Sequence, residues 1–202
     1  MDTSATMTLN QDDTVEAAPL APPGDLAVWF FILAELLVFA VFFIAYAVAR
    51  THDVALFAVM QQTLDPDAGA LNTVLLVSSS WCVARAVLAV DGARLRTGAR
   101  WLLAALACGG GFLLVKGLEY ADKFAEGIGL STNTFYMFYL SLTFFHFMHV
   151  VLGMLVLAVL WHGVRRGHYR RGRLSGLESG AVYWHMVDLV WLVLFPLVYV
   201  LH

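Results

Sequence analysis

The chain has 202 residues, of which 60% are hydrophobic and only 13% are charged, and its mean hydropathy is +0.75. A soluble domain carries about 25% charged residues, so this composition excludes an ordinary soluble fold and indicates a protein of the lipid bilayer. The net charge of −3, without a basic run, does not support nucleic-acid binding, and two cysteines in apolar runs support neither a disulfide framework nor a cysteine-based metal site.

The first 23 residues form a polar tail before the apolar part of the chain. The tail contains acidic residues and no lysine or arginine, so it lacks the basic region of a signal peptide. Its charged residues are Asp2, Asp12, Asp13 and Glu16, and prolines follow at positions 19, 22 and 23. We expect residues 1–23 to be a disordered acidic tail on the cytoplasmic side, and residues 24–202 to be a transmembrane domain.

Five apolar segments follow and predict five membrane-spanning helices. They cover about residues 26–49, 70–90, 101–120, 135–161 and 180–201. A run of about 18 or more apolar residues can cross the hydrocarbon core, and the need to pair every backbone amide there favours single helices. Glycines 109–111 and serines 78–80 permit close approach of neighbouring helices. The predicted fold is an all-α, integral membrane five-helix bundle.

The arginines between the segments predict its orientation. The link after the second segment contains Arg94, Arg96 and Arg100, and the link after the fourth contains Arg165, Arg166, Arg170, Arg171 and Arg173. The two other links contain one basic residue each among several acidic ones. Because basic links stay in the cytoplasm, we expect a cytoplasmic N-terminus and an external C-terminus.

Six histidine, aspartate and glutamate side chains lie in these segments, where a charge near the bilayer centre costs roughly 2.5–3.5 kcal/mol. In chain order they are Glu35, Glu119, His146, His149, His185 and Asp188. Glu35 lies about nine positions into the first segment, which places it close to the bilayer midplane. His146 and His149 are three apart and share a helix face, and so do His185 and Asp188. Lys116 precedes Glu119 by the same spacing.

Three roles are open to these residues. Hydrogen bonds between helices would fix the register of the bundle, and this structural role is the favoured one for the histidines and the aspartate. A role in proton transfer or in binding a lipid headgroup fits Glu35, because apolar surroundings favour a protonated carboxyl. Histidines with carboxylates could also bind iron or zinc, but the paired Glu-x-x-His motifs of di-iron bundles are missing. We therefore assign no catalytic, cofactor-binding or metal-binding residue.

Short motifs along the chain occur in the order of one membrane-protein family. They are Phe30-Phe31-Ile32-Leu33-Ala34-Glu35, Leu71-Asn72-Thr73, Glu119-Tyr120, His146 with His149-Val150 and Gly153, Gly176-Leu177-Glu178, and Tyr183-Trp184-His185-Met186-Val187-Asp188 with Trp191. Over residues 24–202 the chain resembles subunit III of haem-copper oxidases (cytochrome c oxidase subunit 3-like), in a short form without the first two of seven helices. Residues 133–139 and 183–189 are most similar to the nitric-oxide-reductase accessory branch.

This resemblance implies an accessory subunit without an active site, in the bacterial plasma (inner) membrane. Its partner would be the catalytic subunit of a haem-copper oxidase or a nitric oxide reductase, and that partner would hold the haem and copper. The chain would stabilise it, bind membrane phospholipid and support proton uptake. Glu35 would have the proton-related or headgroup role, positioned by an interhelical polar network of His146, His149, His185, Asp188 and Glu119.

Two other functions remain open from the sequence. A stand-alone small transporter or proton channel would also be a compact apolar bundle, although broken helices and inverted repeats, which are typical of transporters, are not evident. A membrane metalloenzyme would use the histidines and carboxylates as ligands. Neither function requires a respiratory partner, so co-purification distinguishes them from the accessory subunit.

Overall fold

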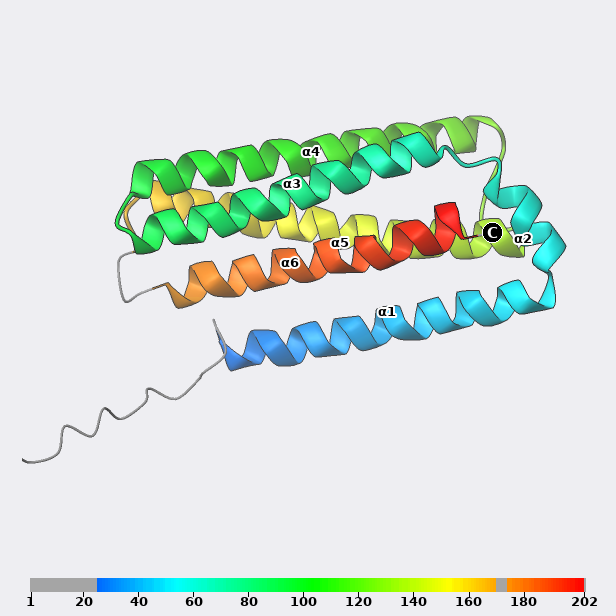
Figure 1. The fold of residues 1–202 in the computed structure, drawn as a ribbon, viewed down its shortest axis with the longest axis horizontal. Helices are drawn as coiled ribbons and strands as arrows, with labels where there is room; N and C mark the ends of the chain where they lie inside the picture. The colour runs from blue at the N-terminus through cyan, green and yellow to red at the C-terminus, as the bar shows by residue number, and fades with distance from the viewer. Residues whose placement is uncertain (1–24, 170–173, 202) are drawn as a thin grey trace, which may run out of the picture.

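The computed structural model describes residues 25–169 and 174–201, in which every regular element is helical (Figure 1). The elements are α1 (Leu26–His52), α2 (Val54–Gln61), α3 (Pro66–Asp91), α4 (Leu95–Ala125), α5 (Thr134–Arg165), α6 (Ser175–Phe195) and the π-helix η1 (Pro196–Val200). In these ranges α1, α3, α4, α5 and α6 with η1 are long and apolar enough to cross a membrane. The predicted all-α fold with five spanning helices is confirmed.

Some predictions fall on residues that lie outside the described ranges. They are the acidic tail of residues 1–23, the C-terminal residue His202, and three arginines of the link before α6, at positions 170, 171 and 173. Which end of the bundle faces the cytoplasm also stays a prediction.

The helices extend beyond their apolar segments. α3 begins at Pro66 and not near residue 70, because the side chain of Asp65 accepts hydrogen bonds from the backbone N–H groups of Asp67 and Ala68 at 2.9 and 3.2 Å. α4 likewise begins at Leu95, and α5 continues to Arg165. The predicted bounds followed hydrophobicity, whereas backbone hydrogen bonding continues into the polar interface until a cap ends it.

The short helix α2 was not predicted, because at eight residues it is too short to span a membrane. It starts at a cap formed by Asp53, whose side chain accepts from the N–H of Leu56 at 3.2 Å. The side chains of Phe57 and Gln61 are buried, and Gln61 Nε2 donates to the carbonyl oxygen of Val198 at 3.0 Å. This helix therefore packs against the C-terminal end of the bundle.

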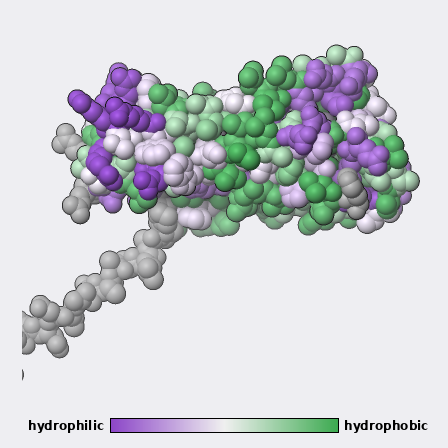
Figure 2. All heavy atoms as spheres, turned by 45° about the horizontal axis from the view of Figure 1, so that its top comes forward, coloured by the Kyte–Doolittle hydropathy of each residue, from purple (hydrophilic) through white to green (hydrophobic). Residues whose placement is uncertain are grey.

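The five long helices run antiparallel to their neighbours in sequence, and α1 lies at the edge of the bundle (Figure 1). α1 packs on α5 and α6 only along one side. Its other side exposes large apolar side chains at helical spacing, which are Phe30, Leu33, Leu37, Val41 and Ile44. Figure 2 shows hydrophobic residues across the middle of the molecule and hydrophilic residues toward its two ends. This distribution suits a bilayer, and the outer face of α1 is open to lipid or to a partner helix.

The indole of Trp184 in α6 packs against glycines of both α4 and α5. A Cβ added to Gly153 of α5 would lie 2.7 Å from this ring, and one added to Gly109 of α4 would lie 3.0 Å from it. Trp184 is fully buried. Glycine at these two positions lets three helices pack around one large side chain.

Candidate functional site

The most distinctive polar contact within the spanning helices joins α1 to α5. Glu35 Oε2 lies 3.0 Å from His149 Nε2, and the other ring nitrogen of His149, Nδ1, lies 2.8 Å from the carbonyl oxygen of Phe145. The side chains of Glu35 and His149 are 21% and 11% exposed, so the pair sits near the surface of the bundle without being open. The rings of Phe39 and Phe145 pack edge-on against the imidazole.

The hydrogen bonds of this pair fix the number of protons that it holds. The carbonyl oxygen of Phe145 can only accept, so Nδ1 of His149 carries a proton. The contact between Nε2 and Glu35 then needs one more proton, which belongs either to the carboxyl or to the imidazole. In both arrangements the pair has no net charge, and the two differ only in the position of one proton. Such a pair can hold a mobile proton at low electrostatic cost in an apolar layer.

An apolar hollow of about 320 Å³ adjoins the pair, between α1, α5 and α6. Its walls include Val28 and Phe31, which precede Glu35 on α1, and Leu152 and Val156, which follow His149 on α5. It therefore lies on the side of the pair toward the start of α1. Tyr183 also lines the hollow, and its hydroxyl donates to the carbonyl oxygen of His149 at 3.4 Å. An acyl chain or an apolar side chain would fit this space.

A second polar cluster is buried toward the other end of the bundle, and it contains Glu119. Lys116 Nζ lies 3.1 Å from Glu119 Oε1, and the hydroxyls of Tyr139 and Tyr199 donate to the same oxygen at 2.5 and 2.7 Å. Lys116 also donates to both hydroxyls. Each hydroxyl thus accepts from the ammonium and donates to the carboxylate, an arrangement that compensates two buried charges.

This cluster, Lys116, Glu119, Tyr139 and Tyr199, connects α4, α5 and η1. The lysine is fully buried, and four aromatic rings lie around its ammonium at 4.8 to 5.9 Å, those of Tyr120, Tyr139, Trp191 and Tyr199. Glu119 therefore contacts neither Glu35 nor His149 in the structure. The sequence did not predict Tyr139 and Tyr199 as partners of Glu119, because they are 20 and 80 positions away from it.

The other predicted site residues lie on α5 and α6, and two of them meet at one serine of α3. His185 Nδ1 lies 2.6 Å from Ser80 Oγ, which joins α6 to α3. Asp188 is buried and interacts with the same Ser80 side chain, while one of its carboxyl oxygens has no partner among the described residues. His146 is fully buried, and neither of its ring nitrogens bonds to a described residue; its ring packs 5.3 Å from that of Trp191. The roles of these residues stay predictions.

The described ranges contain no group of three or more histidine, cysteine, aspartate or glutamate side chains that could hold a metal ion. Glu35 and His149 together provide two ligands, fewer than an iron or zinc site in a helical bundle uses.

Comparison with known proteins gives one family over almost the whole chain. Residues 22–202 match the sequence model of the family described as cytochrome c oxidase subunit III. The chain is 32% identical over 184 residues to the cytochrome c oxidase subunit 3 of Thermostichus vulcanus, covering 87% of this chain and 86% of that protein. It is 37% identical over 175 residues to the protein of the same name in Synechocystis sp., covering 85% and 72%.

A third relative has a different arrangement. The heme-copper oxidase subunit I+III of Aeropyrum pernix is 31% identical over 182 residues, which cover 86% of this chain and 22% of that protein. The matched span of the family, residues 22–202, includes all five long helices and the pair formed by Glu35 and His149.

Proposed function

The chain belongs to the cytochrome c oxidase subunit III family, and from this premise we propose that it serves an oxygen-reducing haem-copper oxidase in a bacterial plasma membrane. An accessory subunit of such an oxidase works beside a catalytic subunit I. The name of the Aeropyrum pernix relative supports this pairing, since it joins subunits I and III in one protein. The haem and copper would be held by the catalytic subunit and not by this chain.

The pair of Glu35 and His149 is the observation that carries the proposed role. It holds one transferable proton without net charge, at a contact between two spanning helices and close to the bundle surface. We propose that the pair helps to supply protons to the catalytic subunit and so extends the number of turnovers before inactivation. The apolar hollow beside it would hold a lipid acyl chain that keeps water away from the pair.

Two substitutions separate a proton role from a structural one. Glu35→Gln keeps an amide that can donate to Nε2 of His149, but the amide does not exchange a proton. Glu35→Ala removes the contact altogether. We expect both variant complexes to show a several-fold shorter turnover lifetime and slower proton uptake, measured as oxygen consumption and pH change in vesicles. His149→Ala should behave in the same way.

The matched control is Glu126→Gln, which removes one carboxylate at an exposed position of the same chain. This variant should keep the lifetime of the unmodified complex. If Glu35→Gln also keeps it while Glu35→Ala loses assembly, the contact is structural and the proton role is wrong.

The partner itself is tested by mild-detergent purification of the tagged chain from native membranes, with optical spectra and mass spectrometry. We expect haem and an oxidase catalytic subunit to co-purify. A nitric oxide reductase is the second candidate, favoured by residues 133–139 and 183–189, and its catalytic subunit would appear instead. A colourless protein without a partner would contradict both and favour the stand-alone transporter.

A further inference from the structure

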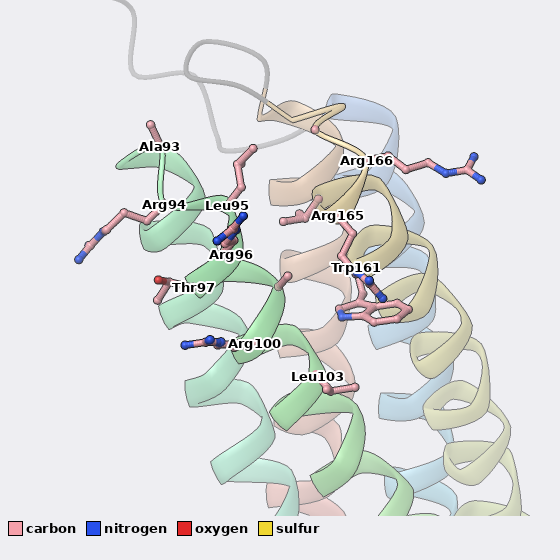
Figure 3. A pocket seen from close by; sticks show the side chains of 13 residues that line it. Ala93, Arg94, Leu95, Arg96, Thr97, Arg100, Leu103, Trp161, Arg165 and Arg166 are labelled. Atoms are coloured by element: carbon pink, nitrogen blue, oxygen red, sulfur yellow. The ribbon is translucent and has the colours of Figure 1, made fainter.

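A basic groove separates the start of α4 from the end of α5, and neither Glu35 nor His149 lines it (Figure 3). Its volume is about 970 Å³, and none of its lining residues comes from α1 or α6. Five arginines line it, three from the α4 side and two from the α5 side: Arg94, Arg96, Arg100, Arg165 and Arg166. In Figure 3, Arg96 lies on the α4 side of the groove and Arg165 on the α5 side, where it turns toward Trp161; the other three point outward.

The groove is basic at its rim and apolar deeper in the bundle. Leu103 lies two turns into α4, and Trp161 lies one turn before Arg165 on α5. The guanidinium of Arg165 stacks over the ring of Trp161 at 4.9 Å. A tryptophan at this level is typical of the membrane–water interface, so the rim lies among the lipid headgroups and the apolar part among the acyl chains.

Within the described residues, no ion pair compensates the positive charge of the groove. None of the five arginines forms an ion pair with a carboxylate in residues 25–169 and 174–201, where the ion pairs involve Lys116, Lys123 and His149. The first N–H groups of α4 also point to this end, as at the start of any helix, and the side chain of the preceding residue, Arg94, does not cap them. Free N–H groups at a helix start attract a phosphate, in addition to the arginines.

The general preference for arginine in cytoplasmic links explains the sign of the charge but not its placement. Scattered arginines would satisfy that preference equally well. Here arginines of two helices line the same groove, whose deeper part is apolar. A ligand that fits needs an anionic group with a hydrocarbon part attached to it, which a small inorganic anion lacks and an anionic lipid has.

We propose that this groove binds an anionic phospholipid, with its phosphate between Arg96 and Arg165 and an acyl chain along Trp161 and Leu103. The site is separate from the apolar hollow beside Glu35 and shares no residue with it. It does not depend on which complex the chain serves. Bidentate contacts from guanidinium groups hold the phosphate, and the additional negative charge distinguishes an anionic lipid from a zwitterionic one.

Native mass spectrometry of the tagged full-length chain in a neutral detergent tests this site, with phosphatidylglycerol added at increasing concentration. The variant Arg96→Gln/Arg165→Gln changes two exposed side chains and should fold normally. We expect it to bind phosphatidylglycerol about thirtyfold more weakly, because each of the two basic residues near the headgroup contributes roughly 1 kcal/mol. The matched control, Arg50→Gln/Lys123→Gln, removes the same charge at the other end of the bundle and should bind as the unmodified chain does.

Two further measurements, with other ligands, identify what the groove binds. Phosphatidylcholine and inorganic phosphate should neither bind comparably nor displace phosphatidylglycerol. Equal retention by the groove variant and the control, or displacement by inorganic phosphate, would overturn the proposal. No phosphatidylglycerol on the unmodified chain would also overturn it and would point to an acidic protein partner.

The position of the acyl chain is tested by fluorescence in vesicles. Phosphatidylglycerol with a brominated acyl chain should quench tryptophan emission more than brominated phosphatidylcholine does. This difference should shrink in Trp161→Phe, because Trp161 lines the proposed acyl position. An unchanged difference in that variant would contradict the assignment of the groove.

Discussion

Exchange of Glu119 for glutamine is expected to lower the free energy of unfolding by about 3–5 kcal/mol, because it leaves the fully buried ammonium of Lys116 without a counter-charge. The amide oxygen of the glutamine can still accept from the hydroxyls of Tyr139 and Tyr199, so the loss reports the charge and not the tyrosine hydrogen bonds. The measurement is unfolding of the purified chain in mixed micelles, followed by circular dichroism.

The same helix offers a matched control for this ion pair. Lys123 and Glu126 have the same three-residue spacing and a separation of 3.0 Å, but the side chain of Glu126 is 54% exposed. Glu126→Gln should cost no more than about 1 kcal/mol, because water screens and solvates an exposed pair.

A double variant tests whether the two buried charges act together. Lys116→Met/Glu119→Gln removes both, so it should be less destabilised than the sum of the two single variants. Additive losses would mean that the lysine and glutamate do not compensate each other, and the cluster would then be held by its aromatic rings alone.

The sequence predicts the features of this fold that depend on local hydrophobicity. Five spanning helices follow from five apolar runs, and the family match confirms the resemblance to subunit III. The resemblance implies a polar network around Glu35 that includes His149, and the structure brings these two residues into contact. The same implied network includes His185 and Asp188, which the structure connects to Ser80 instead. The sequence alone does not reveal which helix faces meet.

Features that depend on partners far apart in the sequence, or on polar residues at helix ends, cannot be predicted from local hydrophobicity. Glu119 is bound by two tyrosines from α5 and η1, and no local pattern relates them. The basic groove arises because the start of α4 lies beside the end of α5, while the sequence shows only two arginine-rich links. Helix α2 is similar: its apolar residues are too few to indicate a span, and its burial becomes evident only against the end of the bundle.

Replacement of Gly153 by alanine is expected to destabilise the chain by about 1–3 kcal/mol, because the new Cβ would lie 2.7 Å from the ring of Trp184 in a packed core. Gly117→Ala is the matched control. It places the same methyl group in a helix interior with nothing within 4 Å, so it should be neutral or stabilise by up to about 1 kcal/mol through helix propensity. Thermal unfolding of the two purified variants measures the difference.

A second substitution distinguishes this steric effect from a change in α5 itself. Trp184→Phe shortens the ring that the new methyl group meets, and it removes no hydrogen bond to a described residue, because the indole N–H has no partner there. Gly153→Ala/Trp184→Phe should therefore lose less stability than the sum of its single variants. If the losses add, the methyl group acts through the backbone of α5, and the close packing of α4, α5 and α6 around Trp184 does not require glycine at position 153.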